Sequence, residues 1–366
     1  MYKKELEAIK KSNRFRQRVI YDDSLTDLAS NDYLGLSENS DLLDKAYKRV
    51  KNYRYHSPRA SQLVNGYHPL HKLLEDYLCE LNDFESAIIV GSGFLANLSL
   101  IESLPRKKDL LILDEFYHAS GVLASKLIDT RVEFFKHNSS KDLESILQQS
   151  KNYSRIIVAV EGIYSMDADI LNRDIFDLCD RYSAILIVDE AHSAGVIGDN
   201  FLGVFDYYNI TPKANHIKMG TLGKALGSYG SYILANREII SFLENRAKAI
   251  IYATAPSIFE SALSYESMKY IQKNSLFLSD KRILVQKLVY DIFGIKMDGL
   301  ILMIEVGDSQ KVLSLRDFAI EEGFLIGAIR PPTVKKAILR IIPRLNIDID
   351  ILESFFLKLK KRIQDV

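Results

Sequence analysis

The feature that most constrains the fold is the alternation of apolar and helical stretches between residues 86 and 188. Five short apolar stretches have the length and composition of buried strands: 86–90, 109–113, 132–135, 154–160 and 184–188. The segments between them carry apolar residues at helical spacing, most clearly at 141–149 and 171–182. Because strands joined through helices run side by side in one direction, the sequence predicts an α/β fold with a mainly parallel sheet flanked by helices.

The length of 366 residues exceeds that of one minimal domain and favours two lobes. We expect an N-terminal segment at 1–40, a large domain at 41–258 and a small α+β domain at 259–366. In the N-terminal segment the pattern predicts a charged helix at 3–18 and a short strand at 25–28. In the small domain it predicts the following strands and helices: 300–306, 324–328, 339–342, 311–322 and 349–363.

The composition argues against several kinds of partner. Basic and acidic residues number 48 each, so no net charge favours nucleic acid or an anionic membrane. No apolar run approaches the ~20 residues that span a bilayer, and the N-terminus lacks the apolar core of a signal peptide, so we expect a cytoplasmic protein. Cys79 and Cys179 fall in different predicted helices and support neither a disulfide framework nor a zinc site.

Two histidines, His68 and His71, lie three residues apart at the start of a predicted helix, 69–81. A metal pair of this kind would need a third ligand at a suitable spacing, and the sequence offers none. Capping or packing of the helix start is the better interpretation, and we expect no metal site.

Polar clusters follow three of the predicted strands. His118 follows one strand, the segment 161–167 follows another, and Asp189 to His192 follow a third. A histidine taken alone is more often a packed core residue than a functional one. In open parallel sheets, however, ligands bind at the carboxyl ends of the strands, so three clusters at equivalent positions favour a shared site.

A glycine-rich stretch, 219–230, surrounds one lysine, Lys224. Glycines let the backbone approach a bulky ligand, and a partly dehydrated ammonium suits a lysine that forms a Schiff base. A surface turn with a solvated lysine is the alternative interpretation. The turn at 91–97 opens a helix and offers free backbone N–H groups, which would suit a phosphate or serve as an ordinary strand-to-helix connection.

Together these parts describe a binding site for pyridoxal 5'-phosphate (PLP). A lysine can hold the aldehyde of this cofactor, an aspartate can keep its ring nitrogen protonated, and a helix start can bind its phosphate. A metalloenzyme or a dehydrogenase would leave the lysine unexplained.

Six motifs in chain order carry a resemblance to a known family: SNDYLGLS, SGFLAN, HAS, EGIYSMDAD, DEAHSAG and GTLGKALG. The chain resembles the α-oxoamine synthases, fold-type I PLP enzymes that join an amino acid to an acyl thioester with loss of carbon dioxide. The resemblance covers residues from about 25 to 345. It implies a fold-type I PLP-dependent transferase with a smaller α+β C-terminal domain, and a homodimer in which segment 251–256 reaches the partner's cofactor phosphate.

The resemblance also implies roles for single residues. Lys224 would form the Schiff base with the cofactor and later remove the α-proton of the amino acid. Asp189 would pair with the pyridine nitrogen, His192 would hydrogen-bond the phenolic oxygen, and His118 would stack on the ring. The remaining cofactor contacts would come from Gly93, Phe94, Ser165 and Thr221.

Substrate recognition is the part that the resemblance defines least. Asn31, Arg330 and Thr333 would face the substrate, and Arg14, with Arg16 and Arg18, would border the pocket or form a solvated helix face. The family's glycine-rich stretch before the Leu-Val-x-Gly segment is here stiffer and more polar, at 56–61.

Within the family the motifs favour alanine and a pimeloyl thioester as substrates, carried by coenzyme A or by a carrier protein. Glycine or serine with another thioester is the alternative. A non-catalytic protein on the same fold is the alternative from a different class.

Overall fold

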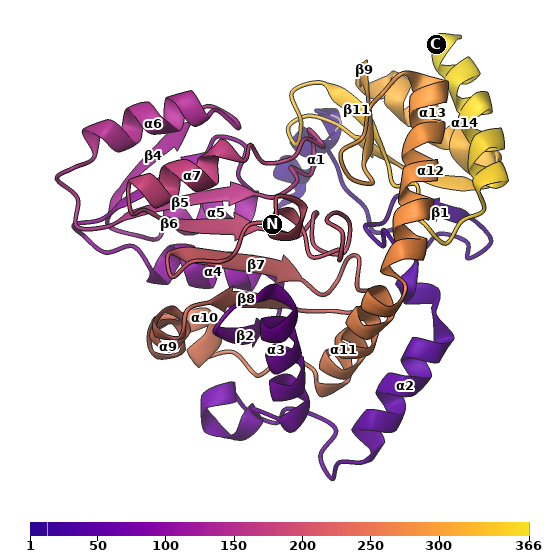
Figure 1. Cartoon of the computed structure of the whole chain (residues 1–366). Coiled ribbons are helices and arrows are strands. Elements are labelled where there is room, and N and C mark those ends of the chain that lie inside the picture. The colour runs from indigo at the N-terminus through magenta and orange to yellow at the C-terminus, as the bar shows by residue number, and fades with distance from the viewer. Residues whose placement is uncertain (13, 366) are drawn as a thin grey trace.

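The computed structural model describes residues 1–12 and 14–365. Its large sheet has seven strands: β2 (Ser86–Val90), β3 (Leu110–Asp114), β4 (Arg131–Phe135), β5 (Ile156–Glu161), β6 (Ile185–Asp189), β7 (His216–Thr221) and β8 (Ser231–Ala235). Their order in the sheet is β2-β8-β7-β6-β5-β3-β4 (Figure 1). The strands from β7 to β4 are parallel, whereas β8 is antiparallel to both β7 and β2. The predicted mainly parallel sheet is therefore confirmed.

Helices cover both faces of this sheet because alternate side chains of each strand point to opposite sides. In β5, Val158 and Val160 belong to one hydrophobic core, while Ile157 and Ala159 belong to a second core. The first core includes side chains from α2 (Ser40–Lys51), α3 (Pro69–Asn82), α6 (Ser140–Gln149) and α7 (Asp174–Arg181). The second includes side chains from α4 (Gly93–Ser103), α5 (Ala119–Ser125), α9 (Arg237–Arg246) and α10 (Lys248–Ile251).

A second sheet has four strands in the order β1-β10-β11-β9. Its strands are β1 (Thr26–Leu28), β9 (Leu302–Gly307), β10 (Phe324–Ile329) and β11 (Ala337–Ile341). The helices from α11 onward are α11 (Ile258–Lys273), α12 (Ser275–Phe293), α13 (Ser309–Glu321) and α14 (Ile349–Gln364). Because β1 runs parallel to β10, the N-terminal segment contributes a strand to the C-terminal sheet. The division of the chain at residues 40 and 258 stays a prediction.

Short helices complete the fold: η1 (Leu36–Glu38), η2 (Gln62–Gly66) and α8 (Val204–Tyr207). His68 and His71 cap the start of α3, as predicted: Nδ1 of His68 accepts from the backbone N–H of Leu70 at 3.2 Å, and Nδ1 of His71 accepts from that of His68 at 3.2 Å. Among the described helices, none is both long enough and apolar enough to cross a membrane.

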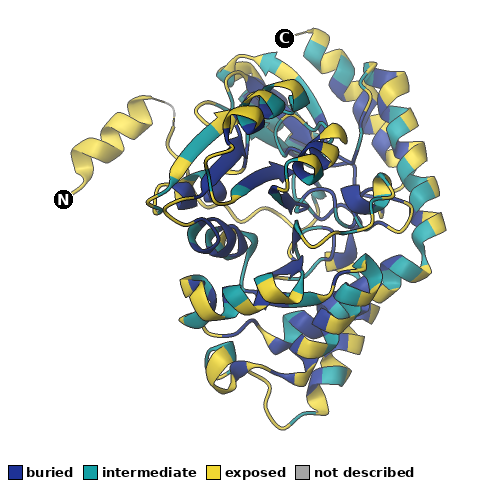
Figure 2. Ribbon diagram, turned by 60° about the vertical axis from the view of Figure 1, so that its left-hand side comes forward, coloured by how far each residue is buried: buried dark blue, intermediate teal, exposed yellow. Residues whose placement is uncertain are grey.

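Two elements differ from the prediction. The N-terminal helix, α1 (Lys3–Lys11), ends well before residue 18, and all of its residues are exposed as it stands away from the body (Figure 2). Helices in proteins are stabilised mainly by packing against other elements, and α1 has no such packing. The helical pattern of the sequence therefore predicted a longer helix than the structure has. The strand β7 was missed because His216 and Lys218 interrupt its apolar run, although both side chains are fully buried.

Candidate active site

The polar residues that follow the parallel strands meet at one edge of the large sheet. The strands β3, β5, β6 and β7 are neighbours in parallel register, so their carboxyl ends lie side by side. Three or four residues beyond these ends come His118, Ser165, His192 and Lys224, each from a different strand. The topology therefore brings together the residues that the sequence pattern predicted to share a site.

The turn that carries Lys224 packs against the N-terminal loop. Gly227 has a φ of +60°, and a Cβ at this position would lie 2.6 Å from the backbone nitrogen of Ser37 and 2.7 Å from the carbonyl carbon of Leu36. Glycine suits both this left-handed backbone and this close approach. The motif SNDYLGLS at 30–37 is thereby held directly beside the lysine turn.

Lys224 is partly buried, and its Nζ lies 2.8 Å from Nε2 of His192. Burial lowers the pKa of Lys224 to about 8, against the opposing effect of the carboxylates of Asp189 and Glu161. Burial, and then the charge of Lys224, lowers the pKa of His192 well below its ordinary value. The lysine can therefore act as a free amine near neutral pH, beside an imidazole that stays uncharged.

Tyr33 extends this contact on the other side of the imidazole. Its hydroxyl is buried and lies 2.6 Å from Nδ1 of His192. Burial raises the pKa of Tyr33 to about 12, so the phenol keeps its proton. Tyr33 was not among the predicted site residues; the only signal was an aromatic side chain within a loop of turn-forming residues.

Asp189, the last residue of β6, is 4% exposed. Its Oδ2 accepts from Nδ2 of Asn97 at 2.8 Å, and its Oδ1 accepts from the backbone N–H of Ala191 at 3.0 Å. The Oδ1 of Asn97 accepts in turn from the hydroxyl of Tyr117 at 2.6 Å. The carboxylate is thus oriented by two donors and can hold a proton on the ring nitrogen of a ligand. Neither supporting residue was assigned this role from the sequence.

A second carboxyl group stands beside that of Asp189. Glu161 is paired with Asp189 in the register of β5 and β6, and it is 3% exposed. Burial, and then the charge of Asp189, raises the pKa of Glu161 well above its ordinary value. Two neighbouring buried carboxyl groups do not both ionise readily, so Glu161 keeps its proton to a higher pH than an exposed glutamate does.

The start of α4 offers space and free donors for an anionic group. Ser92 caps the helix, and its hydroxyl accepts from the backbone N–H of Leu95 at 3.3 Å. A Cβ at Gly93 would meet no atom within 4 Å, and Phe94 is 46% exposed. The remaining amide groups at this helix start suit a phosphate.

Two other predicted cofactor contacts have partners within the chain. Thr221 donates its hydroxyl proton to the carbonyl of Gly230 at 3.0 Å, so it stabilises the turn that holds the lysine. His118 caps α5, with its Nδ1 2.6 Å from the hydroxyl of Ser120. The His118 side chain is exposed, which leaves room for a ring to stack on it.

The predicted substrate-facing residues come from two separate loops. The Oδ1 of Asn31 lies 3.5 Å from the hydroxyl of Tyr33, so Asn31 reaches the site through the N-terminal loop. Arg330 follows β10, and its carbonyl accepts from the backbone N–H of Thr333 at 3.1 Å.

The N-terminal arginines lie differently from one another. Arg14 is exposed, and its Nε donates to the hydroxyl of Ser12 at 3.1 Å, within its own segment. Arg16 instead donates from Nη2 to the hydroxyl of Thr333 at 3.1 Å. Arg16 is therefore the residue of this group for which a contact with a predicted substrate residue is seen.

Arg340 is a further functional candidate that the sequence pattern missed. It lies in β11 and is 6% exposed, with its Nε donating to the carbonyl of Ser165 at 2.8 Å. Its buried Nη2 has no hydrogen-bond partner among the described residues. An unsatisfied buried guanidinium nitrogen suits a carboxylate ligand. The available signal was a lone arginine inside an apolar strand, Ala337–Ile341.

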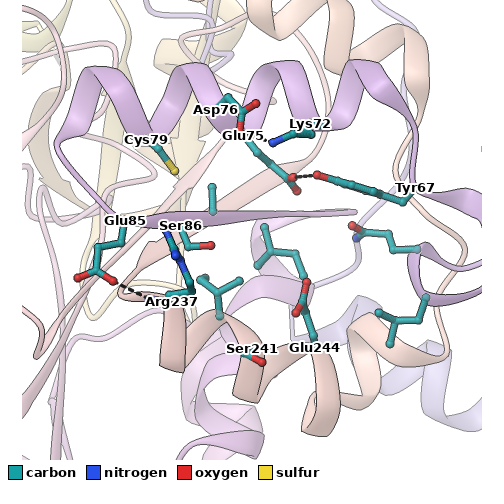
Figure 3. A pocket seen from close by; sticks show the side chains of 15 residues that line it. Tyr67, Lys72, Glu75, Asp76, Cys79, Glu85, Ser86, Arg237, Ser241 and Glu244 are labelled. Atoms are coloured by element: carbon teal, nitrogen blue, oxygen red, sulfur yellow. Dashed lines mark hydrogen bonds and ion pairs between the residues drawn. The ribbon is translucent and has the colours of Figure 1, made fainter.

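A cavity of about 610 Å³ lies elsewhere, between α3, β2 and α9 (Figure 3). None of its lining residues belongs to the lysine site. The carboxyl group of Glu75 hydrogen-bonds there to the hydroxyl of Tyr67, and its Oε1 accepts from the backbone N–H of Ile89 at 3.0 Å. The carboxyl group of Glu75 therefore pairs with a backbone N–H on the outer edge of β2, which is a structural role and not a catalytic one.

The fold and the site define a member of a broad class of α/β transferases. The chain belongs to the aminotransferase class I and II family, whose model matches residues 23–348. Within that family, the chain is 44% identical over 342 residues to the 8-amino-7-oxononanoate synthase of Helicobacter pylori strain J99, covering 93% of this chain and 92% of the relative. It is 34% identical over 353 residues to a putative 8-amino-7-oxononanoate synthase of Aquifex aeolicus, covering 93% of each chain.

Solved structures show the same architecture. A serine palmitoyltransferase of Sphingomonas wittichii superposes with a TM-score of 0.88 at 23% identity, covering 99% of this chain and 97% of that one. The 8-amino-7-oxononanoate synthase of Francisella tularensis superposes with a TM-score of 0.75 at 25% identity, covering 94% of this chain and 99% of that one. At 23% identity the first likeness establishes the fold alone.

Proposed function

We propose that the chain is an 8-amino-7-oxononanoate synthase, a PLP-dependent acyltransferase that joins L-alanine to a pimeloyl thioester with loss of carbon dioxide, in biotin synthesis. The observation that carries this proposal is the 44% identity to the Helicobacter pylori enzyme over nearly the whole of both chains. The site supports it, because a lysine with a lowered pKa, a buried aspartate and an unsatisfied arginine converge at one sheet edge.

The residues present fit the cofactor. When bound, PLP withdraws electrons from the α-carbon of an amino acid, so that bonds to this carbon break more easily. Lys224 would supply the amine for the aldehyde, Asp189 would hold the proton on the ring nitrogen, and His118 would stack on the ring. The start of α4, at Gly93 and Phe94, and Thr221 would bind the phosphate.

The chain's own groups then handle the amino acid. Arg340 binds its carboxylate through the unsatisfied Nη2. Lys224, once free, removes the proton from the α-carbon, since its lowered pKa makes it a base near neutral pH. Ser165 orients Arg340 by accepting its Nε–H. Asn31, Arg330 and Thr333 would face the substrate, with Arg14 as a further candidate at the entrance.

The experiment that tests the substrates is a matrix of three amino acids and three acyl thioesters. Thiol release is measured for alanine, glycine and serine with pimeloyl, acetyl and palmitoyl thioesters. We expect alanine with the pimeloyl thioester to have the highest kcat/KM. One methyl group discriminates by about 1–3 kcal/mol, so some activity with glycine is compatible with the proposal. A higher kcat/KM for glycine with the acetyl thioester, or for serine with the palmitoyl thioester, contradicts it.

The cellular form of the enzyme completes the proposal. We place it in the cytoplasm as a homodimer, in which segment 251–256 of each subunit approaches the cofactor phosphate of its partner. Tyr252 is 80% exposed, and residues 60–71 beside it also expose apolar side chains, which a second subunit would cover.

A further inference from the structure

A row of hydrogen bonds connects the buried hydroxyl of Tyr33 with the amine of Lys224. The Tyr33 oxygen lies 2.6 Å from Nδ1 of His192, and Nε2 of the same ring lies 2.8 Å from Nζ of Lys224. Tyr33 is 0% exposed and His192 is 6% exposed, so water competes poorly for either contact. The direction in which protons point along this row decides whether Lys224 meets a donor or an acceptor at Nε2 of His192.

Two arrangements of protons satisfy these distances while His192 stays uncharged. In the first, Tyr33 donates to Nδ1, the ring proton resides on Nε2, and Nε2–H donates to a neutral Lys224 amine. In the second, Lys224 donates to Nε2, either as the ammonium or as the neutral amine, and Nδ1–H donates to the Tyr33 oxygen. The two arrangements differ in the tautomer of His192, which hydrogen-bond partners decide.

Arg340 favours the first arrangement. Its guanidinium lies beside the Tyr33 oxygen and can only donate to it. In the second arrangement this oxygen accepts from Nδ1–H, and its own proton is left with Oδ1 of Asn31 at 3.5 Å, the outer limit of a hydrogen bond. In the first arrangement the same proton has an acceptor at 2.6 Å.

Charges around the lysine act on the same balance. The carboxylates of Asp189 and Glu161 favour the protonated amine, whereas the charge of Arg340 disfavours it. Because the charge of Asp189 favours the protonated amine, a donor that pairs only with the neutral amine shifts the balance the other way. The Nε2–H of His192 is such a donor, since only an amine with a free lone pair accepts from it.

We propose that Tyr33 is a positioning residue that holds His192 in the tautomer with its proton on Nε2, and thereby keeps an N–H donor aimed at the Lys224 amine. The inference does not depend on which acyl thioester the chain uses, because it concerns groups that are in place before substrate binds. When PLP occupies the site, the same donor is available to its phenolic oxygen.

Nitrogen NMR of the full-length chain tests the tautomer directly. Histidine is labelled with ¹⁵N, and the His192 signals are assigned by their loss in His192→Gln. We expect the protonated nitrogen to be Nε2, both without cofactor and with PLP bound. A protonated Nδ1 in the wild-type chain overturns the proposal, whatever the variants show.

The variant Tyr33→Phe removes only the hydroxyl, and Tyr208→Phe is its matched control. Tyr208 also donates a 2.6 Å hydrogen bond, to the carbonyl of Leu171, but has no contact with the row. In Tyr33→Phe we expect the Nδ1–H tautomer to appear, and the pH midpoint for capture of PLP by Lys224 to move upward, because the neutral amine loses its donor. An unchanged tautomer and midpoint, or an equal change in Tyr208→Phe, contradicts the role of Tyr33.

Discussion

At the scale of single residues, the lowered pKa of Lys224 should control how fast the chain binds PLP covalently. Burial brings this pKa to about 8, so the fraction of free amine rises as the pH passes through that value. The rate at which the cofactor-free chain binds PLP covalently should therefore increase between about pH 7 and 9 and then level off. Stopped-flow absorbance measures this rate.

The variant Lys224→Ala is the control for this measurement. It should show no covalent capture at any pH and no turnover, because no other amine lies at the aldehyde position. Borohydride reduction followed by peptide mapping locates the linkage. Capture at another lysine with retained turnover would exclude Lys224 as the carrier.

The variant Asp189→Asn should bind PLP but lose most of its activity. A neutral amide cannot hold the proton on the ring nitrogen, and its NH₂ group would also face a donor, either Asn97 Nδ2 or the N–H of Ala191. We expect kcat to fall by about 10²–10³, the scale seen when a preorganised electrostatic group is removed. Asp177→Asn, an exposed change on α7, should leave kcat unchanged, and equal values for both variants would refute the role.

Candidate site residues could be chosen from the sequence where they stand next to strand ends and glycine turns. Lys224, Asp189 and His192 have such positions, and the structure brings them into one cluster. Tyr33 and Arg340 were missed because their roles depend on contacts between distant segments, Tyr33 with His192 and Arg340 with Ser165. No local pattern encodes a contact across more than 150 residues of chain.

At the scale of elements, the apolar strands of the parallel sheet were predictable because they are buried on both faces. The strand β7 was not, since its Lys218 looks like a surface residue and is instead hydrogen-bonded internally, to Oδ1 of Asn82 at 2.7 Å. The helix α1 was predicted too long because periodicity cannot show whether a core is available to pack against.

Glu75 connects helix α3 to the edge strand β2, and we expect it to make the stability of the fold depend on pH. Burial raises the pKa of Glu75 to about 7 from its ordinary 4.5. The folded state therefore binds this proton more tightly than the unfolded state, and the stabilisation is present below about pH 4.5 and is lost as the pH rises through 7. The loss amounts to about 3 kcal/mol in the free energy of unfolding.

Urea unfolding from pH 5 to 8 measures this dependence, and Glu75→Gln should flatten it. Glutamine keeps the acceptor for the N–H of Ile89 and cannot ionise beside Tyr67 (Figure 3). The control is Glu80→Gln, an exposed change on the same helix, which should keep the wild-type slope. If Glu75→Gln keeps that slope too, another group causes the pH dependence.

At the scale of the whole molecule, the site is assembled from both ends of the chain. Tyr33 comes from the segment that follows β1, and Arg340 comes from β11 in the same four-stranded sheet, whereas Lys224 belongs to the large sheet. The pairing of β1 with β10 therefore fixes the N-terminal loop with respect to Arg340. A shift of the four-stranded sheet relative to the large sheet would alter the contact of Tyr33 with His192 and that of Arg340 with Ser165 together.

We also predict that two copies of the chain form a dimer in which each subunit contributes to its partner's site. The backbone N–H of Ala255 donates to the carbonyl of Ala60 at 3.0 Å, so segments 60–71 and 251–256 form one surface. This surface exposes Val64 (77%) and Tyr252 (80%), which a monomer would leave in water. We expect a homodimer by analytical ultracentrifugation, with segment 251–256 placed at the partner's cofactor phosphate.

Complementation between two inactive variants tests the shared site. Thr254→Glu places a carboxylate against the partner's phosphate and should abolish cofactor binding there, while Lys224→Ala inactivates its own subunit. In a mixed dimer, the subunit with Lys224 receives an intact Thr254 from its partner, so one of its two sites is complete. Refolding the variants together at equal amounts should restore about a quarter of the wild-type activity, since about half of the dimers are mixed. Mixed dimers that form without any recovery, or a monomer with full activity, would show that each subunit completes its own site.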